Sequence, residues 1–184
     1  MKFIETKFRS VFVVEQNISH DNRGTFVKTF QKSLFNEHQL QTGFVECFHT
    51  KSEKNVIRGM HFQSPPQDHA KLISVIAGTI LDVILDIRID SPTYKQFITL
   101  ELSEENHQSV YIPSGFAHGF CSLSDEVTVS YMTTSEHSPE HDKGIRYDSI
   151  GFDWPIKLPI LSIRDLSSPL FNEFESPFNG ETGL

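Results

Sequence analysis

Two side chains suited to proton transfer lie close together in the sequence. His61 and Lys71 fall in the stretch "RGMHFQSPPQDHAKL", residues 58–72, on either side of a segment with two consecutive prolines. Histidine is the usual general base near neutral pH, and lysine is a compact cation that can stabilise an enolate oxygen. Tyr131 and Asp165 could complete such a site, because a tyrosine can return a proton and a carboxylate can fix the tautomer of a histidine.

Each of these side chains also has a simple structural explanation. A single histidine near a strand end is more often structural than catalytic, and Lys71 could protect an exposed sheet edge from pairing. Tyr131 could belong to the core, and Asp165 in "SIRDLSSP" could be a turn or cap residue. The residue types alone therefore leave proton transfer and structural roles open.

A metal site is the third explanation for these histidines. The stretch "IPSGFAHGF" contains a PxGxxH pattern ending at His118, which resembles the second metal motif of cupins. The first cupin motif would need HxH, but His61 is followed by Phe62 and Gln63. A metal centre needs about three or four converging protein ligands, so the sequence predicts neither a metal nor another cofactor.

The bulk properties predict one soluble domain over residues 1–184. This length favours a single core, and the net charge of −8 disfavours a nucleic-acid partner. The start "MKFIETKFRS" lacks the apolar run of a signal peptide, and no stretch reaches membrane-spanning length. Cys47 and Cys121 are isolated and read as reduced thiols. We therefore expect a cytoplasmic protein without a membrane partner.

The pattern along the chain is mainly β. "SLFNEHQLQTG", residues 33–43, is the one convincing helix, with Ser33 as its cap and Gly43 at its end. Residues 71–87 read as two strands joined by a hairpin turn at Ala77–Gly78, and residues from about 172 read as a loose tail. The spacing favours an antiparallel sandwich or barrel with a ligand at its mouth. Further strands are expected within 10–16, 24–30, 96–102, 109–120 and 126–134.

The order and spacing of several motifs resemble one enzyme family. The chain is similar to the dTDP-4-dehydrorhamnose 3,5-epimerases, cupin-fold enzymes of deoxysugar biosynthesis, from about residue 10 to 171. This resemblance implies a cupin-type jelly-roll barrel with one or two short helices, a homodimer and no metal. The matching stretches are "DNRGTF", "NVIRGMHFQ", "KLISVIAGTILDVILDIRIDSPTYKQF", "LSEENHQSVYIPSGFAHGF", "HSPEHDKGIRYD", "GFDWP" and "PILSIRDLSSPL".

The resemblance implies a role for each candidate catalytic residue. His61 takes the position of the base that removes the proton next to the C4 ketone of a nucleoside-diphospho-4-keto-6-deoxysugar. Asp165 takes that of its paired carboxylate, and Lys71 that of the lysine that stabilises the enolate. Tyr131 matches the acid that reprotonates the sugar from the other face, so that C3, C5 or both are inverted.

The resemblance also implies substrate contacts. Arg23 and Arg58 match residues that grip the diphosphate, for which a guanidinium fork is well suited, and His118 matches a pocket histidine near the sugar and phosphates. Phe26, in the same "DNRGTF" motif as Arg23, is expected at the nucleotide end of the site.

The chain departs from the family pattern at the nucleotide end. Lys28 stands where the family has a glutamate, Phe48 lies in the stretch that replaces "QDNHS", and Glu136 and His137 replace paired tyrosines. Cytosine carries an acceptor at N3 where thymine carries a donor, so Lys28 would suit cytosine.

These departures leave four functions open. The first is an epimerase of the dTDP-4-dehydrorhamnose type. The second is a CDP-linked 3,6-dideoxy-4-ketose 5-epimerase, and the third is a GDP-sugar epimerase, both with the same catalytic residues. The most remote is a cupin that binds a nucleotide sugar without turning it over.

Overall fold

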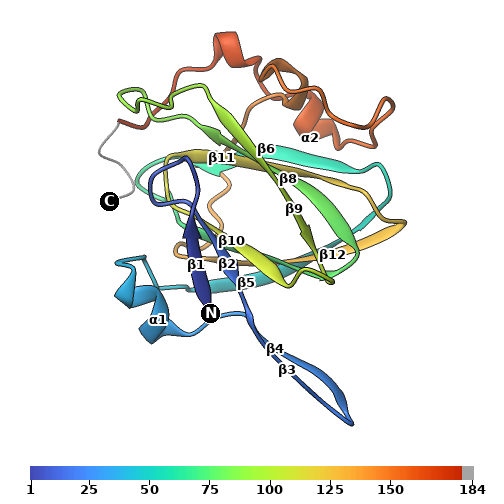
Figure 1. Ribbon diagram of the computed structural model, residues 1–184. Coiled ribbons are helices and arrows are strands. Elements are labelled where there is room, and N and C mark those ends of the chain that lie inside the picture. Colours follow the sequence, from blue (N-terminus) through green and yellow to red (C-terminus); the bar gives the residue numbers. More distant parts are fainter. Residues whose placement is uncertain (180–184) are drawn as a thin grey trace.

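The protein, described here by a computed structural model over residues 1–179, is a jelly-roll barrel made of two facing antiparallel sheets (Figure 1). One sheet has six strands in the order β1-β2-β10-β7-β12-β5. Their bounds are Lys2–Glu5 for β1, Phe12–Glu15 for β2, Gln108–Ile112 for β10, Lys71–Ala77 for β7, Glu126–Thr133 for β12 and Glu46–Glu53 for β5.

The facing sheet has five strands in the order β13-β6-β11-β8-β9. Their bounds are Asp142–Gly144 for β13, Ile57–Gln63 for β6, Phe116–Ser122 for β11, Thr79–Asp86 for β8 and Phe97–Ser103 for β9. The predicted mainly β, cupin-type fold is confirmed by this arrangement.

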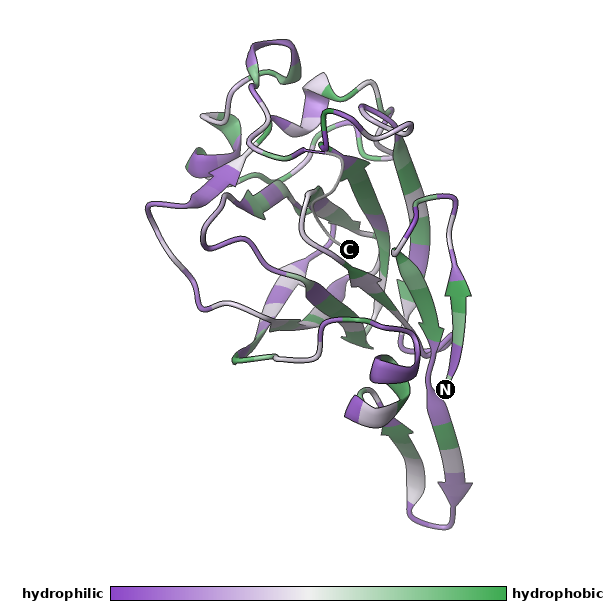
Figure 2. Ribbon diagram, turned by 90° about the vertical axis from the view of Figure 1, so that its left-hand side faces the viewer, coloured by the Kyte–Doolittle hydropathy of each residue, from purple (hydrophilic) through white to green (hydrophobic). Residues whose placement is uncertain are grey.

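Three apolar clusters hold the layers together. The first fills the space between the sheets and includes Ile73, Ile84, Phe120 and Val129. The second joins the outer face of the five-stranded sheet to the C-terminal segment, and the third packs the helix α1 (Lys32–Glu37) against the six-stranded sheet. Figure 2 shows the strands of the barrel as predominantly hydrophobic. The inner faces of the two sheets therefore pack together, their outer faces are partly covered, and an open cavity remains between the sheets.

A two-stranded hairpin projects from the barrel. The strands β3 (Asn17–Asp21) and β4 (Gly24–Lys28) pair only with each other and extend well beyond the sheets (Figure 1). Phe26 on this hairpin is 61% exposed and Ile18 is 40% exposed. Apolar side chains displayed on an arm without a core of its own are typical of a surface that another chain covers.

The structure corrects the predicted hairpin at Ala77–Gly78. β7 pairs with β10 and β12, whereas β8 pairs with β9 and β11, so the chain passes from one sheet to the other at Gly78. Gly78 has a φ of 79°, and a Cβ there would lie 2.3 Å from the carbonyl oxygen of Glu126. The glycine is needed for this crossing, which sequence spacing cannot distinguish from a tight turn.

The predicted helix is shorter than expected. α1 ends at Glu37, and its N-cap is Gln31, not Ser33. Gln39, with a φ of 58°, turns the chain before the expected end at Gly43. A second short helix, α2 (Ile163–Leu166), lies in the C-terminal segment and is capped by Ser162.

The expectation of a loose tail from about residue 172 is wrong as far as residue 179. Phe178 is 1% exposed in the second cluster, and its carbonyl accepts a hydrogen bond from the backbone of Ile89. The rest of that predicted tail, residues 180–184, lies outside the described residues. No helix among residues 1–179 is long and apolar enough to cross a membrane.

Candidate active site

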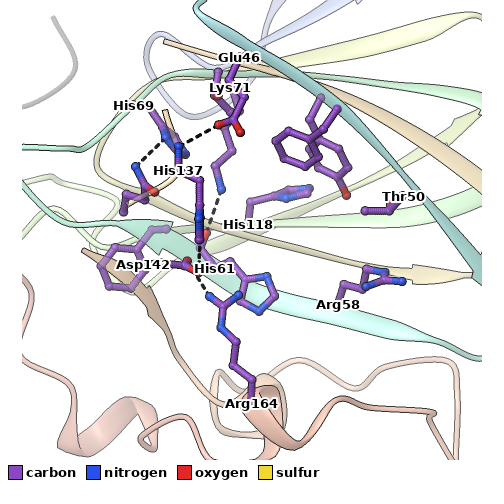
Figure 3. A pocket seen from close by; sticks show the side chains of 15 residues that line it. Glu46, Thr50, Arg58, His61, His69, Lys71, His118, His137, Asp142 and Arg164 are labelled. Atoms are coloured by element: carbon purple, nitrogen blue, oxygen red, sulfur yellow. Dashed lines mark hydrogen bonds and ion pairs between the residues drawn. The ribbon is translucent and has the colours of Figure 1, made fainter. Parts of the chain in front are cut away.

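A cavity of about 260 Å³ lies between the two sheets, where β5 is the edge strand of one sheet and β6 is next to the edge strand β13 of the other. Five strands supply most of its walls: β5, β7 and β12 from one sheet, and β6 and β11 from the other. Figure 3 shows polar side chains from both sheets converging on it. Its lining comprises Glu46, Phe48, Thr50, Arg58, His61, Phe62, Gln63, His69, Lys71, His118, Tyr131, Thr133, His137, Asp142 and Arg164.

His61 faces this cavity with a carboxylate behind it. Its Nε2 lies 2.6 Å from Oδ1 of Asp165, which belongs to α2 and is 2% exposed. Asp165 Oδ2 accepts a weaker hydrogen bond from the Gly59 amide at 3.5 Å. Because an ionised carboxylate only accepts, the Nε2 proton points to Asp165 and Nδ1 keeps its lone pair.

The ionisation of this pair suits a general base. Burial lowers the pKa of His61 below its ordinary value, although the hydrogen bond and charge of Asp165 act against this. Burial acts to raise the pKa of Asp165, but hydrogen bonds from His61, Gly59 and Ser162 hold it below its ordinary value. At neutral pH the pair is thus a neutral imidazole oriented by a carboxylate, the arrangement that activates histidine as a base.

Lys71 lies on the opposite sheet from His61. Its ammonium donates a hydrogen bond to the backbone carbonyl of His61 at 3.3 Å. Burial lowers the pKa of Lys71 to about 8, against the attraction of Asp142 and Asp82. A cation that stays charged near neutral pH beside a histidine base can stabilise negative charge on an oxygen between them.

Tyr131 also stands on the six-stranded sheet, across the cavity from the strand of His61. It is 8% exposed, and burial raises the pKa of its hydroxyl well above the ordinary value. The phenol therefore keeps its proton through the neutral range and can donate it. The structure brings His61, Lys71 and Tyr131 to one cavity, with Asp165 bound to His61 behind it.

Two glycines let β6, the strand that carries His61, approach the neighbouring strand β11. Gly59 on β6 has a φ of 140°, and a Cβ there would lie 2.5 Å from the Cα of Gly119 on β11. A Cβ on Gly119 would lie 2.7 Å from the sulfur of Met60. The register between these strands shifts beside Gly119, where His118 stays paired with His61. Backbone contact thus sets the two histidines side by side.

Comparison with known proteins agrees with this geometry. The family model for dTDP-4-dehydrorhamnose 3,5-epimerase matches residues 5–173. The chain belongs to this family. The predicted family, its fold class and its activity class, an isomerase of the epimerase type, are therefore confirmed.

Relatives of the family match along nearly the whole chain. The dTDP-4-dehydrorhamnose 3,5-epimerase of Methanothermobacter thermautotrophicus is 42% identical over 160 residues, 85% of each protein. That of Shigella flexneri is 38% identical, over 93% of this chain and 96% of its own. A crystal structure of dTDP-6-deoxy-D-glucose-3,5-epimerase from Legionella pneumophila, in complex with dTDP-4-keto-L-rhamnose, is 36% identical with a TM-score of 0.92, covering 96% of this chain and 97% of that one.

Four of the substrate-binding residues predicted from the family line the cavity. Arg58 is held by Ser52, its Nε donating at 2.9 Å to the hydroxyl. His118 is buried, with Nε2 2.6 Å from Oδ2 of Asp82. Phe48 and His137 are the other two, and both lie partly exposed on the cavity wall.

The other three predicted binding residues are not in this cavity. Arg23, Phe26 and Lys28 lie on the β3–β4 hairpin, and Arg23 pairs with Asp21 on that arm. Figure 1 shows the arm pointing away from the barrel. Within one chain, therefore, the epimerase-family motif "DNRGTF" is separated from His61.

Sequence reasoning did not assign several polar residues of the cavity, among them Glu46, His69, Asp142 and Arg164. Asp142 accepts hydrogen bonds from Arg164 Nη2 at 2.6 Å and from His137 Nε2 at 3.2 Å. Glu46 accepts the backbone N–H of His137 at 2.9 Å. His69 also lines the cavity, and burial lowers its pKa to about 3. The signals were available for Arg164, which precedes Asp165, and for Asp142, in the "HSPEHDKGI" motif.

The described residues offer no metal-binding cluster. Among residues 1–179, no three His, Cys, Asp or Glu side chains converge on one point. His118, in the PxGxxH pattern, instead pairs with Asp82, and His61 with Asp165.

Proposed function

We propose that this protein inverts a dTDP-linked 4-keto-6-deoxysugar at carbons next to its ketone, as a dTDP-4-dehydrorhamnose 3,5-epimerase. The observation that carries the proposal is the His61–Asp165 pair at 2.6 Å, opening on the same cavity as Lys71 and Tyr131. The family's relatives named for this reaction support it.

The residues divide the reaction into two proton transfers. His61 Nδ1 takes the proton from the carbon next to the ketone, and the C–H electron pair moves to the ketone oxygen as an enolate. The Lys71 ammonium stabilises that oxygen. When the carbonyl reforms, the carbon takes the Tyr131 proton from the opposite face, which inverts the centre.

A second copy of the chain would complete the substrate site. The cavity of about 260 Å³ lies below the range of roughly 300–1,000 Å³ for small-molecule sites, so we assign it to the sugar and the adjoining phosphate. Arg58 would bind that phosphate, and His118 would lie near the sugar. We infer a cytoplasmic homodimer in which the projecting hairpin supplies Arg23, Phe26 and Lys28 to the partner's site.

The nucleotide is the second part of the proposal. The dTDP-linked ligand of the Legionella pneumophila structure supports dTDP. Lys28 in place of a glutamate is the one observation that favours a CDP-linked substrate, since it offers a donor to cytosine N3. The catalytic residues are the same for both substrates, and also for a GDP-linked one.

Solvent isotope exchange tests the reaction. In deuterated water the protein should incorporate deuterium at C5, and at C3 as well for a double epimerase, while converting dTDP-4-keto-6-deoxyglucose. His61→Asn keeps a donor for Asp165 and should abolish exchange without loss of the fold. Exchange by this variant at the wild-type rate would rule out His61 as the base. Nucleotide-sugar binding by the wild type without any exchange would instead support a binding protein.

A further inference from the structure

An exposed aromatic side chain lies flat against the proposed proton donor. Phe48 on β5 and Tyr131 on β12 are direct partners in the register of the six-stranded sheet. Their ring centroids are 4.9 Å apart and the planes are inclined by only 12°. Phe48 is 43% exposed, so its ring is not simply part of the core. One of the two faces of the Phe48 ring contacts the Tyr131 ring.

The tyrosine ring has a second aromatic neighbour from the facing sheet. The His118 ring lies 6.3 Å from that of Tyr131 at an angle of 71°, and the buried pair with Asp82 fixes His118. Tyr131 thus receives a stacked contact from its own sheet and an edge contact from the other. Both are orientations that aromatic pairs prefer.

We propose that Phe48 is a positioning residue for Tyr131: by stacking on the phenol it fixes the direction from which the proton returns. The inference rests on the proposed function. It differs from the role expected from the sequence, in which Phe48 contacts the nucleotide. The phenolic oxygen lies at the far end of the ring, so a small ring rotation moves the proton away from the carbon that must receive it.

Losing this contact should affect the two proton transfers unequally. Removal of the proton by His61 does not involve Phe48, so exchange with solvent should continue. When Tyr131 is displaced, the enolate is reprotonated by His61 from the face that lost the proton. The result is labelled substrate with unchanged configuration. The ratio of exchange to inversion therefore reports on the position of Tyr131.

The experiment compares Phe48→Leu and Phe48→Ala with the wild type in deuterated water. NMR measures deuterium incorporation and inversion at C3 and C5 on the same sample, and calorimetry measures the Kd for dTDP. We expect inversion to fall about 10- to 100-fold, as for a misplaced catalytic group, with exchange within about twofold and dTDP affinity unchanged. Phe48→Tyr keeps a stacking ring and should restore inversion.

The control is Cys47→Ala. Cys47 directly precedes Phe48 on β5 and is exposed. Its side chain points to the other face of the sheet because strand side chains alternate. It should leave inversion and exchange unchanged. An unchanged exchange-to-inversion ratio in Phe48→Leu would overturn the proposal, and weaker dTDP binding in that variant would assign Phe48 to the nucleotide. If the wild type shows no exchange at all, it is the proposed epimerase reaction that fails.

Discussion

Burial lowers the pKa of both His61, the proposed base, and Lys71, its proposed cationic partner. It lowers the pKa of His61 below its ordinary value and that of Lys71 to about 8. For histidine this favours the neutral form that accepts a proton. For lysine it brings deprotonation within reach of mildly alkaline pH. The two shifts together define the pH window in which a neutral base faces a cationic lysine.

The first prediction is the shape of this window. As pH falls, kcat/KM should stay constant through pH 6.5. The pKa of His61 is lowered from its ordinary value of 6.5, so the imidazole is still neutral there. As pH rises, activity should decline near pH 8, because Lys71 loses its charge while Tyr131, with a raised pKa, does not yet titrate. Initial rates from pH 5 to 10 measure both limits.

Lys71→Arg separates the two residues that could cause the alkaline limit. Arginine stays charged throughout this range, so the residual activity of the variant should extend to higher pH. An alkaline limit that stays near pH 8 in Lys71→Arg would show that another group sets it.

At the scale of elements, the backbones of the paired strands β6 and β11 approach each other closely. Gly59 and Gly119 allow the two backbones to meet, and this contact sets His61 beside His118. α2 then seals the back of β6, because Asp165 reaches His61 and the Gly59 amide. His61 is thus held by the close pairing of two strands and by a single helical turn.

The second prediction concerns this close pairing of β6 and β11. Gly59→Ala places a methyl group 2.5 Å from the Gly119 Cα at a φ of 140°. Overpacking of this kind costs about 1–3 kcal/mol of unfolding free energy, and the activity should fall further because β6 carries His61. Gly43→Ala is the matched control, since a Cβ there has nothing within 4 Å. Urea unfolding that is equal for the two variants would contradict the prediction.

Most of the strands, and the residues that we propose as catalytic, could be located from the sequence. Alternating apolar residues located β7, β8, β9 and β12, and family motifs identified His61, Lys71 and Tyr131. Pairing could not be predicted, because the crossing at Gly78 and a hairpin turn share one local pattern. The cavity roles of Glu46 and His69 also escaped prediction, because they depend on contacts with the distant residues 134–142.

At the scale of the whole molecule, the main feature is that the β3–β4 hairpin lies apart from the cavity. The arm carrying Arg23 and Phe26 leaves the barrel and displays apolar side chains. In the proposed homodimer, each site would combine a barrel from one copy with an arm from the other. A C2 pair would form two identical sites in this way.

The third prediction tests this exchange of arms. His61→Asn and Arg23→Ala subunits should each have little activity alone. Coexpressed in equal amounts, they should recover about one quarter of the wild-type activity, because half of randomly formed dimers have one intact site. Gel filtration establishes the dimer. Absence of recovery in mixed dimers would show that each barrel does not use its partner's arm.

The fourth prediction concerns the nucleotide. A ligand that binds only the folded protein raises its melting temperature by mass action. In a panel of dTDP, CDP, GDP and UDP at equal concentration, dTDP should give the largest shift. Lys28→Glu is the control for the hairpin residue and should leave this order unchanged. A larger shift with CDP, reversed in Lys28→Glu, would favour the CDP-linked substrate.

The proposed base and the two residues proposed to stabilise and reprotonate the enolate belong to different sheets. His61 stands on β6, whereas Lys71 and Tyr131 stand on β7 and β12. The reacting sugar would lie between the two sheets. It would lose its proton to a residue on one sheet and regain a proton from a residue on the other. The rate of turnover would then depend on the distance between the two sheets. Mild urea that loosens the packing of the sheets should abolish turnover while circular dichroism still reports intact strands. A saturating nucleotide sugar should restore the spacing of the sheets.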